Sequence, residues 1–483
     1  MKPLNSRSNS NLMLLNIAFC SLIALFYSCG SGGGGDSAAA SGKGSVGFSL
    51  ALANPAAARA MNFRAAADAE VQFECETAEY QIATIEAQVV DKNGVVLVDG
   101  SWNCDKHRAT ISGITPGDGI VVKVFAKDAD GVVLFEGQSD LLIVVAGQTT
   151  DAGLITLTSI NARLVGDFIG TSFGSDYWVG LSDVNFDGLG SGNFEQLLNS
   201  DRSSQSGTLT YNVAVDGSLT SRLSSGEVFG GILNAGEDIL AAADTDWADD
   251  SIEMDVAVKT SAGLSNAILN GDYIGVRISD GLTTAVTQVN FDGHGSGTYL
   301  ILAASDPSLV SSQASDITYT VDPANGRVAV SGGGADSDGI VNDHGTVVSM
   351  VDPLNRGPRE DNDMTVLIKT SSGLSNATID GDYTAVSFGY YLGEGFDEET
   401  SLMSISADRV GNMVFEVLSN SSGGSGQFEA TYSVNSNGHI TINLPNDEVY
   451  EGIVSSNGDI FTIVNTDLAD EFIEMGVAIR KTQ

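Results

Sequence analysis

A long internal repeat limits the folds that are open to this 483-residue chain. A Gly-Asp-aromatic tripeptide begins at Gly166, Gly271 and Gly381, so one copy takes roughly 105–110 residues. The linkers after the first two copies are nearly identical, KTSAGLSNA at 259–267 and KTSSGLSNA at 369–377. Chance does not keep such a register. The repeat therefore predicts three structural units built to one plan.

Each copy consists of short strands. A Thr-Tyr pair, at Tyr211, Tyr319 and Tyr432, precedes an Asp-Gly or Asn-Gly hairpin turn in every copy. Apolar and other residues alternate strictly in the last strand, as at 254–258, and this period of two predicts a half-buried antiparallel strand. The second copy predicts eight strands, which begin near Tyr273, Ala285, Thr298, Ile317, Arg327, Ile340, Val347 and Met364.

Eight short antiparallel strands can close into an up-and-down barrel, which removes the exposed sheet edges on which β-proteins aggregate. We therefore predict an all-β chain with three tandem antiparallel barrels at 161–262, 263–372 and 373–483; a two-sheet sandwich per copy is the alternative. The layout resembles avidin and lipocalin barrels, with a Gly-x-aromatic opening strand and VNFDG at 289–293. This resemblance implies a barrel but no ligand residues. The alternating apolar side chains predict interiors that are filled.

Residues 69–158 predict a separate β-sandwich. Apolar runs such as 82–90 and 120–126 alternate with turn residues at the spacing of about 8–12 residues that is typical of sandwiches. The segment resembles the prealbumin-like or immunoglobulin-like modules of bacterial surface lipoproteins in ISGITPG at 111–117 and VVAGQT at 144–149. That resemblance implies strands and turns, and it says little about a ligand.

The N-terminus predicts export. Lys2 and Arg7 precede an apolar stretch at 12–27, which is short for a membrane span of about 20 residues. We therefore predict a signal peptide at residues 1–28.

Cys29 follows this leader and begins a segment rich in Gly, Ala and Ser, so residues 29–68 predict a flexible tether. The leader resembles those of bacterial lipoproteins, although Phe26 and Tyr27 stand where a lipobox has Leu and a small residue. The resemblance implies a lipid anchor on Cys29 and sorting to the outer membrane. An ordinary cleaved signal is the alternative.

Two cysteines, Cys75 and Cys104, lie beyond the leader and its Cys29. In an exported chain such a pair predicts one disulfide, with a metal pair or free thiols as the alternatives.

The chain is strongly acidic, with a formal net charge of −40. Such a field repels phosphate backbones, so we exclude nucleic acid as a partner. One acidic stretch precedes the last strand of the first copy and predicts a solvated loop, with cation or partner binding as the alternative. Its members are Asp244, Asp246, Asp249, Asp250 and Glu253.

Asp183, Asn185 and Asp187 match the opening of a calcium loop, in which alternating oxygen side chains converge on the ion. Phe194 stands where such a loop has its bidentate acid, and the pattern dissolves in the other copies. A hairpin turn is therefore the alternative to a calcium site, and no other cofactor is predicted.

The sequence contains no recognisable catalytic constellation, because its four histidines do not recur between the copies. We therefore predict a non-enzymatic outer-membrane lipoprotein of the cell envelope, held at the membrane by its lipid. Its tandem domains would serve adhesion, binding of a protein or glycan partner, or structural spacing. The alternative is a small ligand inside each barrel. An internal void of roughly several hundred Å³ with converging polar groups would favour a ligand, and solid packing would favour display.

Overall fold

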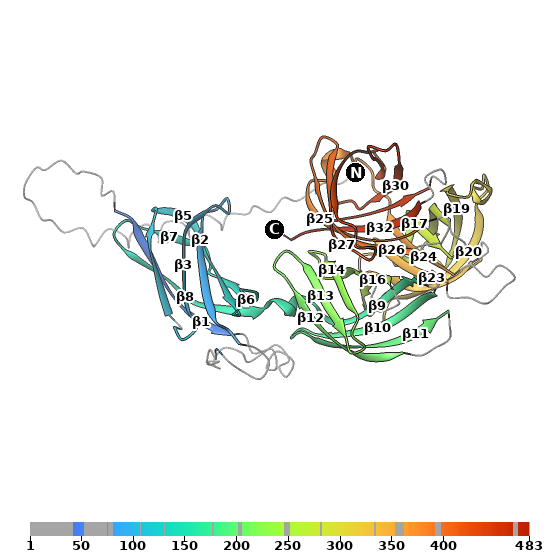
Figure 1. The fold of residues 1–483 in the computed structure, drawn as a ribbon. Coiled ribbons are helices and arrows are strands. Elements are labelled where there is room, and N and C mark those ends of the chain that lie inside the picture. The colour runs from blue at the N-terminus through green and yellow to red at the C-terminus, as the bar shows by residue number, and fades with distance from the viewer. Residues whose placement is uncertain are drawn as a thin grey trace, which may run out of the picture.

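The computed structural model describes residues 42–52, 75, 81–106, 108–129, 131–175, 178–200, 205–245, 252–280, 283–332, 335–352, 362–391, 398–466 and 472–482. The described chain is all-β, as predicted, with one curled sheet followed by three closed barrels (Figure 1). None of the helices in these residues is both long and apolar enough to cross a bilayer. The predicted signal peptide and Cys29 lie outside the described residues.

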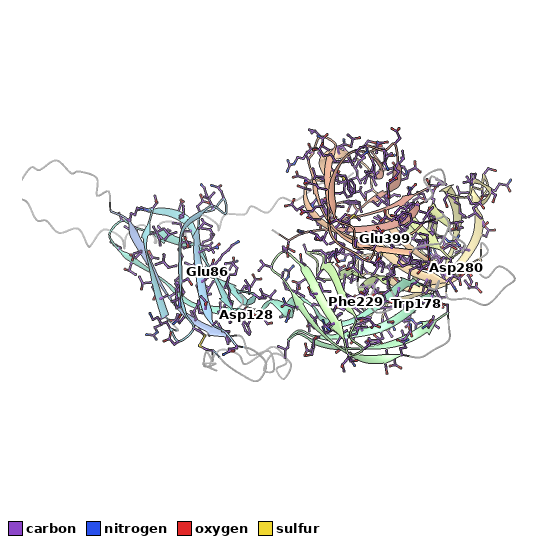
Figure 2. All side chains as sticks on the ribbon, in the orientation of Figure 1. Glu86, Asp128, Trp178, Phe229, Asp280 and Glu399 are labelled. Carbon is purple, nitrogen blue, oxygen red and sulfur yellow. A yellow bond between two sulfur atoms is a disulfide. The ribbon has the colours of Figure 1, made fainter. Side chains whose placement is uncertain are left out.

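The N-terminal unit is one continuous sheet in the order β3-β2-β5-β6-β8-β1-β4, with β7 paired to β5. Glu86 and Asp128 belong to this unit in Figure 2. The sheet curls around its own apolar core. In the described chain its two halves, β3-β2-β5-β6 and β8-β1-β4, are joined only at β6 and β8 and enclose this core between them, as in the predicted sandwich. Its strands are β1 (Gly44–Leu52), β2 (Thr84–Val90), β3 (Val96–Asn103), β4 (Arg108–Ile114), β5 (Gly117–Lys127), β6 (Val133–Gln138), β7 (Leu142–Val144) and β8 (Thr149–Ser159).

This unit begins earlier than predicted. β1 lies inside the predicted tether, yet it is an inner strand that runs antiparallel to β4 and parallel to β8. Its buried side chains are Val46, Phe48, Leu50 and Leu52. The prediction of a tether over 44–52 is therefore wrong, because the Gly, Ala and Ser content concealed an apolar alternation of period two.

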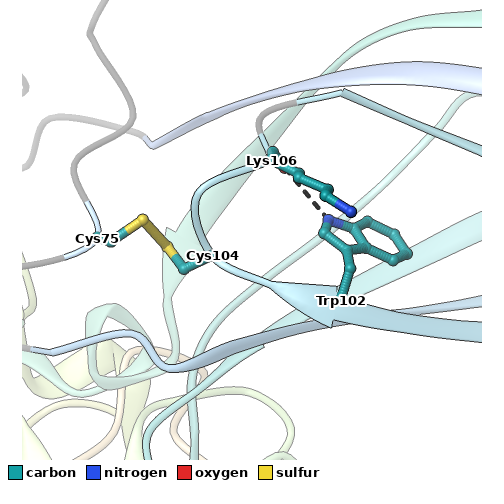
Figure 3. The surroundings of a disulfide bond; sticks show 4 residues. All are labelled: Cys75, Trp102, Cys104 and Lys106. Carbon is teal, nitrogen blue, oxygen red and sulfur yellow. Dashed lines mark hydrogen bonds between the residues drawn. A yellow bond between two sulfur atoms is a disulfide. The ribbon is translucent and has the colours of Figure 1, made fainter.

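Cys75 and Cys104 form the predicted disulfide, with their Cα atoms 5.8 Å apart (Figure 3). Cys104 is buried just beyond the end of β3. Next to it, the Trp102 indole Nε1 donates a hydrogen bond of 3.2 Å to the Lys106 carbonyl. The disulfide thus joins the chain at Cys75 to the turn between β3 and β4.

The three barrels confirm the predicted up-and-down topology, because each closes by pairing its last strand with its first. The first barrel comprises β9 (Val165–Gly174), β10 (Trp178–Asp187), β11 (Ser191–Asn199), β12 (Ser206–Val213), β13 (Ser218–Leu223), β14 (Val228–Leu233), β15 (Ile239–Asp244) and β16 (Glu253–Lys259). The second comprises β17 (Asn270–Ser279), β18 (Thr283–Asp292), β19 (Ser296–Ala304), β20 (Ser315–Val321), β21 (Arg327–Gly332), β22 (Ala335–Val341), β23 (Val347–Asp352) and β24 (Asp363–Lys369). The third comprises β25 (Gly381–Tyr391), β26 (Glu398–Ala407), β27 (Asn412–Asn420), β28 (Gly426–Val434), β29 (His439–Asn443), β30 (Val449–Val454), β31 (Ile460–Asn465) and β32 (Phe472–Arg480).

A short 3-10 helix covers one end of each barrel, and the repeated tyrosine holds it there. The Tyr211 hydroxyl donates a hydrogen bond of 2.7 Å to the carbonyl of Leu164, which follows the first of these helices. Tyr319 and Tyr432 make the same bond, at 2.9 and 3.0 Å, beside their own helices. This bond explains why the Thr-Tyr pair recurs in the sequence. The helices are η1 (Ile160–Arg163), η4 (Asn266–Ile268) and η6 (Asn376–Thr378).

The barrels pack against one another around a shared apolar core. The alternating residues of each last strand point out of their own barrel into this core. The prediction that they fill their own barrel is therefore wrong. These residues are all at most 1% exposed, and they are Met254, Val256 and Val258 in β16, Met364, Val366 and Ile368 in β24, and Met475, Val477 and Ile479 in β32.

The contacts between barrels form a closed ring. The second strand of one barrel packs on the seventh strand of the next, β10 on β23, β18 on β31 and β26 on β15. The end of the chain also returns to the first barrel. The Thr482 amide donates a hydrogen bond of 2.8 Å to the Asp216 carbonyl of the first barrel. In the same way, the Ser261 amide donates a hydrogen bond of 3.2 Å to the Asn325 carbonyl of the second barrel. The three repeats thus form a pseudo-threefold ring, with the curled sheet to one side of it (Figure 1).

Candidate ligand-binding site

The first barrel encloses a cavity of about 370 Å³, lined by side chains from all eight of its strands. Trp178 and Phe229, which are labelled in Figure 2, form part of its wall. A cavity of this size can hold one small molecule. The prediction of filled interiors is therefore wrong for the first barrel.

The cavity exists because small side chains stand where the second barrel has large ones. Strand register fixes the equivalent positions, since Ser172 pairs with Asp255 and Arg277 pairs with Thr365. By the same register, three positions that hold small side chains in the first barrel hold larger side chains in the second. The pairs are Ser172 with Arg277, Ala242 with Met350, and Ala257 with Leu367.

The two ends of the cavity differ in polarity. At one end, Phe186, Leu209 and Leu240 belong both to its wall and to the apolar core that η1 covers. At the other end, β15 finishes and β16 begins, and the wall carries Asp244, Glu253 and Asp255. A ligand that fits both ends needs an apolar body and a polar head.

The carboxyl groups at the polar end lie close enough to perturb one another. Burial raises the pKa of Asp255 to about 7. The Ser172 hydroxyl donates a hydrogen bond to this carboxylate, which lowers the pKa and so offsets part of the rise. Burial also raises the pKa of Glu253 well above its usual value, and the neighbouring carboxylates of Asp255, Glu227 and Asp244 raise it further. The described wall residues include no Lys, Arg or His that could neutralise this charge.

The prediction of a solvated loop is therefore wrong for two members of the acidic stretch, Asp244 and Glu253. Asp244 is only 1% exposed and ends β15, while Glu253 begins β16, and both face the cavity. The intervening acidic residues of the stretch lie outside the described residues. Asp255 was not identified as a candidate site residue from the sequence. The signal for it was present, because Glu253 and Asp255 alternate with apolar residues and so share the opposite face of β16.

Asp183 and Asn185, two of the predicted calcium ligands, lie on the outer face of β10, away from the cavity. The Asn185 side-chain amide donates a hydrogen bond of 2.5 Å to the Asp167 carboxylate. Asp187, at the end of the strand, accepts hydrogen bonds of 2.7 and 3.0 Å from the amides of Leu189 and Ser191. The segment is thus a strand and a hairpin turn. Within the described chain, no group of three His, Cys, Asp or Glu side chains is placed to hold a metal.

Fold and site together define an all-β protein of three linked barrels, one of which encloses a ligand-sized cavity. No protein-family model matches the chain, and no curated protein matches it.

The chain aligns with solved structures of transferrin binding protein B. A double mutant of that protein from Haemophilus parasuis Hp5 is 9% identical, over 87% of this chain and 99% of the other, with a TM-score of 0.27. The isotype 1 protein from serogroup B Neisseria meningitidis is 8% identical, over 64% and 66% of the two chains, with a TM-score of 0.26.

Proposed function

We propose that this chain is a binding protein of the bacterial cell envelope whose first barrel holds one small ligand. The observation that carries the proposal is the cavity of about 370 Å³, which joins an apolar wall to converging carboxylates. The sequence is compatible with display and with binding inside the barrels. A hollow barrel favours binding inside, and a solidly packed barrel favours display. The cavity favours internal binding.

The arrangement of the barrels supports the same choice. A spacer gains length only when its domains follow one another in a line. Here the last strand of each barrel is buried against the other two, and the end of the chain returns to the first barrel. The ring therefore adds little reach, whereas it gives the hollow barrel a rigid support.

The binding test uses the fluorescence of Trp178, which lines the cavity. The full chain with Trp102→Phe and Trp247→Phe keeps Trp178 as its one tryptophan. We expect heptan-1-ol to change the Trp178 emission saturably and to raise the melting temperature. At 100 times its Kd, a ligand adds about 2.7 kcal/mol to the free energy of unfolding.

The matched control for this test fills the cavity. Ala242→Met with Ala257→Leu introduces the side chains that the second barrel has at these positions. This variant should fold and lose the saturable signal. A linear response, equal in both proteins, would contradict internal binding.

We also propose that Cys29 carries the lipid anchor and places the protein in the outer membrane. The support is the leader sequence and the glycine-rich segment that follows it. Cells that express the full chain should incorporate labelled palmitate into it, and Cys29→Ala should abolish the label. Equal labelling of both proteins would refute the anchor.

A further inference from the structure

We infer that the ligand of the first barrel carries one organic cation, an ammonium or guanidinium group, on an apolar body. The inference rests on the proposed function and specifies the chemistry of its ligand. Three equivalent carboxylates in the three barrels carry the argument.

Every barrel has an acidic residue at the same inner position of its last strand. Glu253 pairs in register with Gly174, Asp363 with Ser279, and Glu474 with Gly389. The three acids therefore occupy one structural position, which lies inside the barrel beside the first strand. A buried carboxylate is costly unless it has a partner.

The second and third barrels supply that partner from their own side chains. In the second barrel, the Arg277 guanidinium Nη2 lies 2.9 Å from the Asp363 carboxylate, and both side chains are largely buried. In the third barrel, the Tyr450 hydroxyl donates a hydrogen bond of 2.7 Å to the Glu474 carboxylate.

The first barrel lacks both the arginine and the tyrosine that partner the equivalent carboxylates in the other two barrels. Ser172 stands at the position of Arg277, and Phe229 stands at the position of Tyr450. Within the described residues, no side chain forms an ion pair or hydrogen bond with the Glu253 carboxylate. The space that Arg277 takes in the second barrel is open in the first and belongs to the cavity.

The second barrel thus resembles the first with its ligand in place, the Arg277 guanidinium acting as the cation. An anionic ligand would add charge of the same sign to Asp244, Glu253 and Asp255, and a neutral one would leave the negative charge of the Glu253 carboxylate uncompensated. The Gln196 side-chain oxygen, buried in the same wall and without a hydrogen-bond partner among the described residues, offers one further acceptor. A bare metal ion would satisfy the acids but leave the apolar end empty, so an organic cation fits better.

The test compares three probes with the same heptyl chain, heptan-1-amine, heptan-1-ol and heptanoate, on the protein with Trp178 as its one tryptophan. A charge-assisted hydrogen bond should make the amine bind about 10- to 100-fold tighter than the alcohol. Heptanoate should bind most weakly. Glu253→Gln should weaken amine binding far more than alcohol binding and so remove most of the preference for the amine.

Two further variants sharpen this test. Glu429→Gln removes an equal charge from an exposed position on β28 and should keep the parent's preference. Ser172→Arg introduces the arginine of the second barrel and should abolish binding of both the amine and the alcohol. Melting curves establish that each variant is folded.

The outcomes separate the inference from the proposed function. If no probe binds saturably, internal binding itself is wrong. If the alcohol binds as tightly as the amine, or if Glu253→Gln keeps the preference, the cation inference is wrong and internal binding stands. Tighter binding of heptanoate, or saturable Ca²⁺ binding without a preference for the amine, would also overturn the inference.

Discussion

At the scale of single residues, the buried carboxyl group of Asp255 makes the stability of the protein depend on pH. Burial raises its pKa to about 7, so the folded protein holds this proton more tightly than the unfolded chain does. Its contribution to stability is complete below the unfolded pKa of about 4 and is lost as the pH rises towards about 7. The pKa of Glu253 is raised in the same direction, and Glu227 and Asp244 also face it.

We therefore expect the melting temperature of the ligand-free protein to fall as the pH rises from about 4 to about 7, where these carboxyl groups ionise in the unfolded chain. Asp255→Asn cannot ionise, so its melting temperature should fall less over the same range. Asp316→Asn, at an exposed position on β20, should keep the parent's pH dependence. Thermal melts at each pH measure the difference, and an equal fall in all three proteins would contradict the assignment.

The repeated tyrosine makes a second prediction at this scale. The Tyr211 hydroxyl donates to the Leu164 carbonyl and accepts a 2.8 Å hydrogen bond from the Gly188 amide. Tyr211→Phe leaves both buried groups without this partner and should lower the free energy of unfolding by about 1–3 kcal/mol. Urea unfolding measures the loss. Tyr319→Phe and Tyr432→Phe should cost similar amounts, and a neutral effect of all three would show that the bond is unimportant.

At the scale of strands, the sequence was enough to predict eight strands per copy and their closure. Turn residues mark the strand ends, and an alternation of period two marks each strand's faces. The alternation cannot say which face points inward when both faces are buried. In β16 the apolar face of Met254 meets the other barrels, and the acidic face of Asp255 lines the cavity. The sequence pattern alone predicts the reverse, with the apolar face of this strand inside its own barrel.

The cavity was beyond prediction for a related reason. Its volume depends on the sum of side-chain sizes over eight strands, and Ser172, Ala242 and Ala257 are far apart in the sequence. Each is unremarkable alone. Only the register between strands shows that they adjoin, and that the second barrel has larger residues at the same positions.

The outward direction of the apolar face can be tested directly. Met254 is fully buried, so Met254→Ala should cost about 2–5 kcal/mol of unfolding free energy, as in any well-packed core. Thr220, exposed on the outer face of β13, is the matched control, and Thr220→Ala should stay within about 0.5 kcal/mol of the parent. Chemical denaturation measures both. A small effect of Met254→Ala would mean that the barrels do not share a core.

At the scale of the whole molecule, we expect the curled sheet and the ring to be separate stability units. The sheet has its own core and its own disulfide. The bond spans 29 residues of sequence, and its loss, by Cys75→Ser with Cys104→Ser, should cost about 3 kcal/mol. Calorimetry should show a lower melting temperature for the sheet and an unchanged one for the ring. A shift in both transitions would show that the two units unfold together.

The ring itself could not be predicted from the repeat, because tandem copies can also follow one another as beads on a string. Its closure depends on three similar interfaces, β10 on β23, β18 on β31 and β26 on β15. Such head-to-tail contacts form a closed object when the rotation between neighbours completes a circle. Because each barrel contributes to one common core, no barrel can unfold without exposing apolar surface of the other two.

We therefore expect the three barrels to unfold in a single cooperative transition. In calorimetry, the van't Hoff and calorimetric enthalpies of this transition should agree, which is the test for two-state unfolding. Met254→Ala, although it lies in the first barrel, should shift the whole transition to lower temperature, whereas the double cysteine variant should leave it in place. If Met254→Ala instead splits off a separate early transition for the first barrel, the barrels are independent domains and the ring is not a cooperative unit.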